Sequence, residues 1–461
     1  MMERLFKGIT TLCRIVVGAL FVVSGLIKSN DALGFMYKLQ EYFEPGALNL
    51  EFLTPYALEV AVFVCIAEIL LGVALLLGAL PKLTIVLTTA MILFFTWLTW
   101  YTATCDPFGM KEMIGPDGAV FTIANQCVLE CGCFGNAIPL TPLQSFYKDL
   151  ILMVFVTPIL IAAFRNKITL NDSRTSMIIY TGALVMTFMF GYLMLDWNFP
   201  TLYLILLLFA AGLIRKRVSH PSLEWIMASA VVVVIVIVQI ITLNHLPIKD
   251  YRPYAVGESI SENRMFAEDL GLKGPVFATE YLFKNILTGQ DSIVLSTDYL
   301  KVYNDPSFIA TYEIVTYDGS EVKVSDGYEP RILDFQMIND SGDDLTDSLL
   351  SNQGYTFLHI SKDLDDSNGA GQEQLNALST ASETMGVSFY GLTNVGYDRN
   401  EDFKHEFQAP YEFLTCDQTE LKIVIRSNPG LVLIKDGVVI EKWAWRDIPA
   451  FEDLNLSLNL K

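Results

Sequence analysis

Four of the seven cysteines in this 461-residue chain lie close together, at Cys105, Cys127, Cys131 and Cys133. The tightest pair encloses Gly132, and a glycine between two cysteines lets the backbone turn sharply. Thiols this close exchange partners through mixed disulfides when they are accessible and partly ionised. The residue types and their spacing therefore predict a site for thiol–disulfide chemistry.

The same four cysteines also fit a structural role. On the oxidising side of a membrane, cysteines in one loop are more often bridged than free, and such bridges need not exchange. A zinc site is disfavoured because the loop has no histidine and lacks paired CxxC knuckles. We therefore expect disulfides without a metal, and the sequence leaves open whether they are catalytic or structural.

Arg14 and Glu68 each interrupt a long apolar run. At the rise of an α-helix, both lie about 15 Å from the same end of their predicted helices. A charge at that depth costs at least ~2.5 kcal/mol unless it is paired or faces a cavity. We therefore expect a buried ion pair between Arg14 and Glu68, which either fixes the helix register or belongs to a functional site.

The composition is that of a membrane protein. Hydrophobic residues make up 52% of the chain and charged residues only 18%, and the mean hydropathy is +0.40. A helix needs about 20 apolar residues to cross the hydrocarbon, and irregular backbone facing lipid is too costly. The sequence predicts seven such helices, the sixth being short, at 5–27, 57–79, 83–104, 146–164, 177–195, 201–214 and 223–243.

Basic residues fall on one side of this seven-helix topology: Arg4, Lys7, Lys82, Arg165, Lys167, Arg174, Arg215, Lys216 and Arg217. Cytoplasmic loops carry such an excess of lysine and arginine. We therefore expect a cytoplasmic N-terminus, with the cysteine loop and the C-terminal part outside. The first helix should be retained, because no small-residue cleavage site follows it.

The formal net charge of −20 comes almost entirely from the C-terminal part, since residues 245–461 hold 36 acidic and 17 basic residues. A block this acidic repels nucleic acid and anionic lipid head groups. The sequence therefore excludes a nucleic-acid partner and favours an extracytoplasmic protein partner or a small molecule.

Four parts follow from these patterns. Residues 1–165 form a membrane core of four helices with the external cysteine loop at 105–145. Residues 166–245 add three helices, which contain no cysteine and are interpreted as an anchor. Residues 246–337 combine a proline-containing linker with a small β-rich region, in which Asp-Gly pairs are typical of hairpins. Residues 338–461 form the last domain.

The last domain has the order of elements of a thioredoxin fold. A strand, a helix, a strand and a short helix precede a hairpin about Asp436-Gly437, and Pro429 before it resembles the proline that is cis in thioredoxins. Active thioredoxins carry CxxC after the first core strand, where this chain has 361–366 without a cysteine. Cys416, the only thiol of the domain, is interpreted as inert. We therefore expect a thioredoxin-like domain without dithiol chemistry.

Short motifs of the first part resemble the DoxX superfamily and its MauE branch of redox-associated membrane proteins, at 14–18, 24–28, 67–72 and 131–135. The resemblance extends over about residues 10–165, and the remainder looks like the long Bacteroidetes-type members. It implies a four-helix membrane core related in outline to disulfide-forming and quinone-linked oxidoreductases. A bacterial inner membrane and quinone as the electron acceptor are the location and cofactor that this resemblance implies.

Two functions are therefore expected. In the first, the protein is a thiol–disulfide oxidoreductase, whose catalytic cysteines pass electrons between an external protein and a lipid-soluble acceptor such as a quinone. In the second, it is a non-catalytic membrane anchor or assembly subunit. The cysteines are then structural, and the thioredoxin-like domain docks secreted proteins or lipoproteins.

Overall fold

The computed structural model describes residues 2–106, 109–114, 120–128, 132, 134–316, 321–367 and 369–458. The chain forms two compact units. The first comprises residues 1–252 together with 425–430 and 443–448, and the second comprises 253–424, 431–442 and 449–461.

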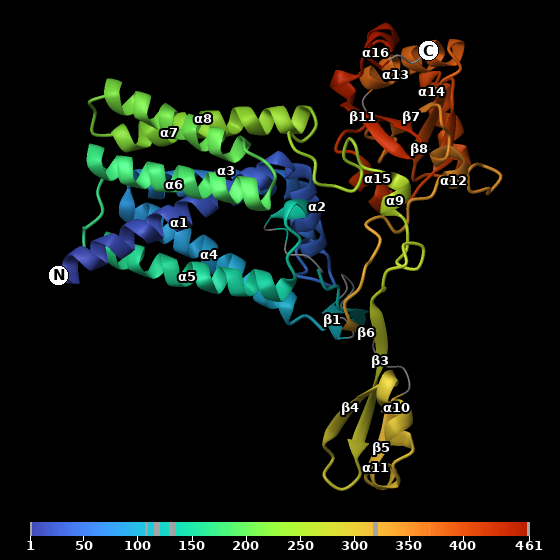
Figure 1. Cartoon of the computed structure of the whole chain (residues 1–461), viewed down its shortest axis with the longest axis horizontal. Helices are drawn as coiled ribbons and strands as arrows, with labels where there is room; N and C mark the ends of the chain where they lie inside the picture. The colour runs from blue at the N-terminus through green and yellow to red at the C-terminus, as the bar shows by residue number, and fades with distance from the viewer. Residues whose placement is uncertain are drawn as a thin grey trace. The chain divides into compact units, whose positions relative to one another are not determined.

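Helices dominate the first unit (Figure 1). Seven of its described helical segments are long and apolar enough to cross a membrane, as the sequence predicts. A 3-10 turn, η1 (Glu51–Tyr56), leads directly into the second of them. The seven helices are α1 (Met2–Asn30), α3 (Ala57–Leu77), α4 (Pro81–Ala103), α5 (Pro142–Phe164), α6 (Ser173–Met194), α7 (Phe199–Arg217) and α8 (Leu223–Asn244).

Helix α1 is the centre of this bundle and packs against α3, α5 and α6. Its contact with α3 is close because glycines face each other: a Cβ added at Gly72 would meet the carbonyl oxygen of Gly18 at 2.8 Å. Small residues allow two helix backbones to approach in this way where lipid supplies no hydrophobic drive between helices. Helix α4 packs on α5, and α7 packs on α8.

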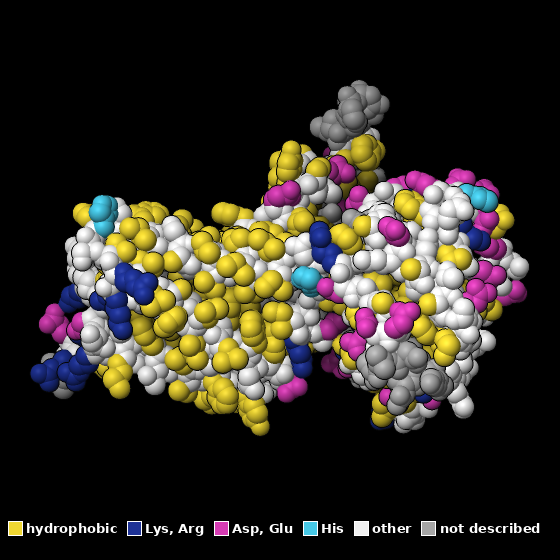
Figure 2. All heavy atoms as spheres, turned by 90° about the horizontal axis from the view of Figure 1, so that it is seen from above, with side chains coloured by type: hydrophobic (Ala, Val, Ile, Leu, Met, Phe, Trp, Pro, Cys, Tyr) yellow, Lys and Arg dark blue, Asp and Glu magenta, His cyan; other side chains and the backbone are white. Residues whose placement is uncertain are grey.

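The outer surface of the bundle is apolar. Figure 2 shows a broad hydrophobic belt over the helices, with lysine and arginine side chains gathered at one end of the bundle. Exposed large side chains such as Phe94, Val154 and Phe209 belong to this surface. Lipid is the solvent that such a belt requires, because an exposed apolar area of this size is not tolerated in water.

The connections of the first unit contain structure that the sequence analysis does not predict. Helix α2 (Ala32–Phe43) lies in the connection between α1 and α3 and packs on α3. The connection after α4 holds an antiparallel hairpin of β1 (Met110–Ile114) and β2 (Val120–Ala124), followed by the short η2 (Gly135–Ala137). The peptide bond between Asn428 and Pro429 is cis.

A five-stranded sheet in the order β11-β10-β7-β8-β9 organises the C-terminal part of the chain. Strands β7, β8 and β9 run parallel, which requires a crossover between successive strands. Strand β9 and α15 were not predicted, because a four-residue strand carries little periodicity. The elements are β7 (Tyr355–Ile360), α13 (Gly369–Thr384), β8 (Ser388–Thr393), α14 (Tyr397–Phe407), β9 (Glu412–Thr415), α15 (Gln418–Val424), β10 (Gly430–Lys435), β11 (Val438–Ala444), η3 (Trp445–Asp447) and α16 (Phe451–Leu458).

A smaller antiparallel sheet lies within residues 276–325, where the sequence predicts a β-rich region. Its long central strand β3 pairs with β4, β5 and β6. The elements of this region are α9 (Ile260–Asn263), β3 (Val276–Asn285), β4 (Asp291–Leu295), α10 (Ser296–Tyr303), α11 (Pro306–Thr311), β5 (Tyr312–Thr316), β6 (Glu321–Ser325) and α12 (Thr346–Leu350).

Candidate functional site

Two of the four predicted site cysteines form a disulfide. Cys105 lies just beyond α4, Cys127 lies just beyond β2, and their Cα atoms are 5.7 Å apart. The bridge closes a segment that contains the β1–β2 hairpin. Both cysteines are half-buried, so this connection is cross-linked at the base of its hairpin.

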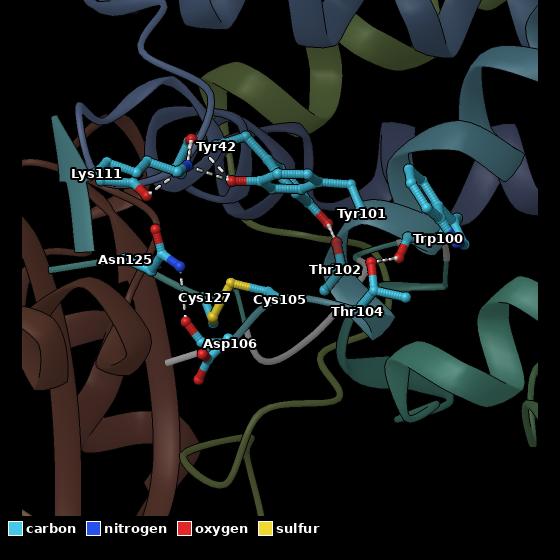
Figure 3. Close-up of a disulfide and its surroundings, with 12 residues drawn as sticks. Tyr42, Trp100, Tyr101, Thr102, Thr104, Cys105, Asp106, Lys111, Asn125 and Cys127 are labelled. Atoms are coloured by element: carbon cyan, nitrogen blue, oxygen red, sulfur yellow. Dashed lines mark hydrogen bonds between the residues drawn. A yellow bond between two sulfur atoms is a disulfide. The ribbon is translucent and has the colours of Figure 1, made fainter. Parts of the chain in front are cut away.

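The hairpin is held to the preceding connection by Lys111 on β1 (Figure 3). The Lys111 ammonium donates to the carbonyl oxygens of Gly46 and Ala47, at 3.0 and 2.5 Å, and to the hydroxyl of Tyr101 at 2.8 Å. Asn125 donates to the carbonyl oxygen of Asp106, beside the disulfide. These hydrogen bonds from one lysine join the hairpin to the irregular segment around Gly46 and Ala47, and they satisfy carbonyl groups that have no helical partner there.

The other two predicted cysteines, Cys131 and Cys133, lie outside the described residues, but the residues that follow each of them are described. Gly132 has φ +69°, a left-handed conformation that favours glycine. A Cβ added at Gly132 would contact the side chains of Lys38 and Phe35 on α2. Phe134 is 8% exposed, and its ring lies 5.8 Å from that of Phe190 on α6. Gly132 therefore lies against α2, and Phe134 lies against the helix bundle.

The predicted ion pair between Arg14 and Glu68 is wrong. Arg14 is buried, but its guanidinium donates to the carbonyl oxygens of Leu75 and Leu76 and to the side chain of Asn171. Leu75 and Leu76 belong to the last turn of α3, where carbonyls lack helical partners and attract a cation. They lie seven and eight residues beyond Glu68, or about 10–12 Å along the helix axis. Arg14 therefore caps α3 and does not reach Glu68.

Glu68 pairs instead with Lys28, which lies two residues before the end of α1. The Lys28 ammonium lies 2.7 Å from Oε2 of Glu68 and 2.8 Å from the hydroxyl of Ser24, and both charged side chains are less than 5% exposed. The ammonium also lies 5.3 Å from the ring centroid of Phe95 on α4. Paired charges offset much of the cost of burial, and an aromatic face adds to the stabilisation of the cation.

This ion pair faces a cavity of about 340 Å³. Helices α1, α3, α4, α5 and α6 and the segment after the cysteine motif form its walls. Most of the lining is apolar, and four phenylalanines contribute to it: Phe21, Phe95, Phe134 and Phe190. A largely apolar cavity with a few convergent polar groups is the usual form of a small-molecule site.

A second ion pair lies on the α5 wall of the cavity. Lys148 lies 3.0 Å from Oδ1 of Asp149, and Thr99 of α4 donates to Oδ2 of Asp149 at 3.2 Å. Asp149 is 2% exposed, whereas a quarter of the Lys148 side chain is exposed. The Lys148 ammonium also lies 5.3 Å from the ring centroid of Phe134. This pair therefore contacts the residue that directly follows Cys133.

Comparison with known families gives a match to one part of the chain. Residues 7–106 match the family model of Methylamine utilisation protein MauE. Comparison with curated proteins gives no significant match.

The MauE-like segment supplies part of the site and leaves part to the rest of the chain. It includes Lys28, Glu68 and Cys105, and it ends before Cys127 and Asp149. The polar residues of its first and third helices thus meet side chains from α5 and α6, which lie beyond the match.

Sequence reasoning missed Lys28 and Asp149 and interpreted α6 as part of an anchor. The predicted first helix ends at residue 27, but α1 continues to Asn30, and both Lys28 and Asn30 are buried. The signal was available, because Ser24 and Lys28 are four residues apart and share one helix face. Helix α6 supplies Phe190 and Met194 to the cavity wall, so it is more than an anchor.

The thiol of Cys416 is unsuited to exchange. Cys416 is 4% exposed, and burial raises its pKa to about 12. A thiolate is the nucleophile in disulfide exchange, and a thiol with this pKa is almost entirely protonated at neutral pH. The interpretation of Cys416 as an inert thiol is consistent with this environment.

Proposed function

We propose that the protein is a redox-associated membrane protein, in which the external loop cysteines exchange disulfides with a protein partner and pass electrons to a lipid-soluble acceptor. The observation that carries this proposal is the position of Phe134. It directly follows Cys133 in the sequence, and its ring lines an apolar cavity inside the helix bundle. Because Phe134 is the next residue after Cys133 in the chain, we propose that the loop thiols reduce an acceptor that reaches this cavity from the lipid.

The proposed reaction balances with a quinone as the acceptor. A loop disulfide oxidises two thiols of the external protein to a disulfide and is itself reduced to two thiols. These two thiols then give two electrons and two protons to the quinone, which leaves as the quinol, and the loop disulfide forms again. Cys131 and Cys133 are the proposed exchanging residues, and Cys105–Cys127 is the bridge that anchors their loop.

The proposal requires the loop to lie on the oxidising side of the membrane. The gathering of lysine and arginine at one end of the bundle supports a cytoplasmic location of that end (Figure 2). The cysteine connection follows the C-terminal end of α4, at the other end of the bundle. We propose a bacterial inner membrane, with residues after α8 on the periplasmic side.

The C-terminal domain is proposed to be thioredoxin-like and to dock the partner protein. The strand order, the parallel β7 and β8, and the cis peptide before Pro429 support this fold. The buried thiol of Cys416 and the absence of cysteine from 361–366 favour docking over redox chemistry. Its acidic surface is suited to a basic patch on a secreted protein or lipoprotein.

Native membranes that contain the full chain provide the test. After mild dithiothreitol treatment, alkylation followed by mass spectrometry should find thiols at Cys131 or Cys133 while the bundle stays folded, and decylubiquinone should reoxidise them. A Cys416→Ala variant is the matched control and should exchange normally. If no bridge can be reduced before the bundle unfolds, the oxidoreductase proposal is wrong.

An anchor or assembly subunit is the second candidate, and the hairpin favours it. Lys111 and the Cys105–Cys127 bridge make a fixed, cross-linked surface, which is what a structural loop requires. A variant that lacks all four loop cysteines distinguishes the two functions. In an anchor it would lose stability and keep partner binding, whereas in an oxidoreductase it would stop oxidation of the partner.

A further inference from the structure

The cavity beside Phe134 contains two complete ion pairs, and their charges determine what it accepts. Lys28 with Glu68 and Lys148 with Asp149 bring two positive and two negative charges to its wall. Among the lining residues that the structure describes, each charge has a partner of opposite sign. An anionic lipid or a fatty acid would add an unbalanced charge in a low-dielectric site, which is costly. These balanced charges favour an electrically neutral occupant.

The remaining lining favours a flat ring. Phe21, Phe95, Phe134 and Phe190 contribute to the walls, and stacked or edge-to-face aromatic contacts stabilise a planar group. Lys28 and Lys148 are hydrogen-bond donors and so recognise oxygen acceptors on such a ring. A volume of about 340 Å³ is at the low end for small-molecule sites, so it suits a ring with the start of a tail rather than a whole lipid.

The relation between α5 and α6 indicates on which side the cavity faces lipid. Helices α5 and α6 both line it and both pack against α1, yet they do not pack closely against each other (Figure 1). The cavity is partly open to its surroundings. Since exposed apolar side chains such as Ile151 and Met189 cover these two helices, the medium outside this gap is lipid. This is the side on which an apolar tail could extend from the cavity into lipid.

We propose that this cavity binds a neutral, two-oxygen ring on an apolar tail, with Lys28 and Lys148 as the donors that hold its oxygen atoms and Glu68 and Asp149 as the residues that position the two lysines. The inference rests on the proposed function, because this ring is the acceptor that the loop thiols reduce. It assigns the recognition of the ring oxygen atoms to Lys28 on α1 and Lys148 on α5. Lys28 and Glu68 lie within the MauE-like segment, whereas Lys148 and Asp149 lie beyond it.

Binding is measured on the full chain in nanodiscs of phosphatidylcholine without quinone, with decylubiquinone and menadione as neutral probes and oleate as the anionic probe. Wild type should bind both quinones, and it should bind oleate at least tenfold more weakly than either quinone. Leu152→Trp fills the cavity and should weaken quinone binding at least tenfold. Leu193→Trp on the exposed face of α6 is the matched control and should bind as wild type does.

The charges are tested separately from the shape. The double variant Lys28→Met/Glu68→Gln removes one ion pair without leaving a net charge, and it should weaken quinone binding about tenfold while the protein stays folded by thermal unfolding. Equal quinone binding by wild type, Leu152→Trp and the double variant would overturn the inference, as would tighter binding of oleate than of quinone.

The same samples separate this inference from the proposed function. If decylubiquinone reoxidises the loop thiols but its binding ignores the cavity variants, the acceptor lies elsewhere and only the inference fails. If quinone binding depends on the cavity but the loop thiols never exchange, the inference about the ligand stands and the oxidoreductase function fails.

Discussion

Lys28 and Glu68 form an ion pair at 2.7 Å in which neither side chain is more than 4% exposed. They come from α1 and α3, the two helices that pack closely through Gly18 and Gly72, so a close helix contact of the bundle also carries a buried ion pair. The pair faces the cavity beside Phe134, and its net charge is zero.

Removing one member of this pair should be worse than removing both. Lys28→Met or Glu68→Gln alone should lower the free energy of unfolding by about 3 kcal/mol or more, because one polar group is left buried without its partner. The double variant should cost less than the sum of the two. Thermal unfolding in detergent measures this coupling. Arg14→Leu with Glu68→Gln is the control and should be additive, since these residues do not pair. Additive losses for Lys28 and Glu68 would contradict the ion pair.

The glycine contact between α1 and α3 should tolerate no side chain. A Cβ at Gly72 would lie 2.8 Å from a backbone oxygen of α1, so Gly72→Ala forces the helices apart and should destabilise by about 1–3 kcal/mol. Gly212→Ala on α7 is the control, because a Cβ there meets nothing within 4 Å and alanine favours a helix. The midpoint of thermal unfolding should fall for the first variant only; a fall of equal size in both would refute this account of the packing.

Cys416 should resist alkylation in the folded protein. With its pKa raised to about 12 by burial, roughly one thiol in ten thousand is ionised at pH 8. N-ethylmaleimide should therefore label Cys416 at least a hundredfold more slowly in the native chain than after denaturation, as measured by peptide mass spectrometry. Rapid native labelling at pH 8 would mean that this thiol is accessible and would reopen a redox role for the domain.

The sheet of the C-terminal part should lose stability as the pH falls from about 7 to about 5. His359 on β7 is fully buried beside the hydroxyl of Tyr411, and burial lowers its pKa to about 3. The unfolded chain binds a proton near pH 6.5 and the folded chain does not, so protonation favours unfolding below about pH 6.5.

The expected loss is about 2 kcal/mol at pH 5, and the effect ends only below the folded pKa. Amide hydrogen exchange of β7 and β8 peptides in the full chain, corrected for intrinsic rates, measures it. His359→Phe removes the titrating group and should flatten the pH dependence between pH 7 and 5. An unchanged slope in this variant would assign the effect to other groups.

The two ends of the bundle should lie in different compartments. A reporter such as alkaline phosphatase, which is active only outside the cytoplasm, should be active when fused after His245. The same reporter fused after Val218, between α7 and α8, should be inactive and serves as the matched control. The opposite pattern would place the cysteine loop in a reducing compartment and sink both proposed functions.

The seven helices could be predicted from the sequence because lipid leaves the backbone no alternative. A run of about 20 apolar residues that crosses hydrocarbon must satisfy its peptide groups internally. The clustering of Cys105, Cys127, Cys131 and Cys133 in one connection was likewise visible, since it is a property of the chain and not of its packing. The short elements α2 and β9 were missed because polar surroundings and short length blur their periodicity.

The sequence by itself determined which segments cross the membrane and at what depth Arg14 and Glu68 lie, because each residue advances a helix by a fixed rise. It did not determine their partners. Arg14 and Glu68 are at matching depths in the sequence, but only the packing of α1 on α3 decided that Arg14 caps Leu75 and Leu76 and that Glu68 takes Lys28. The cavity, too, was decided by tertiary structure, since its walls come from five helices whose rotation about their own axes no linear pattern fixes.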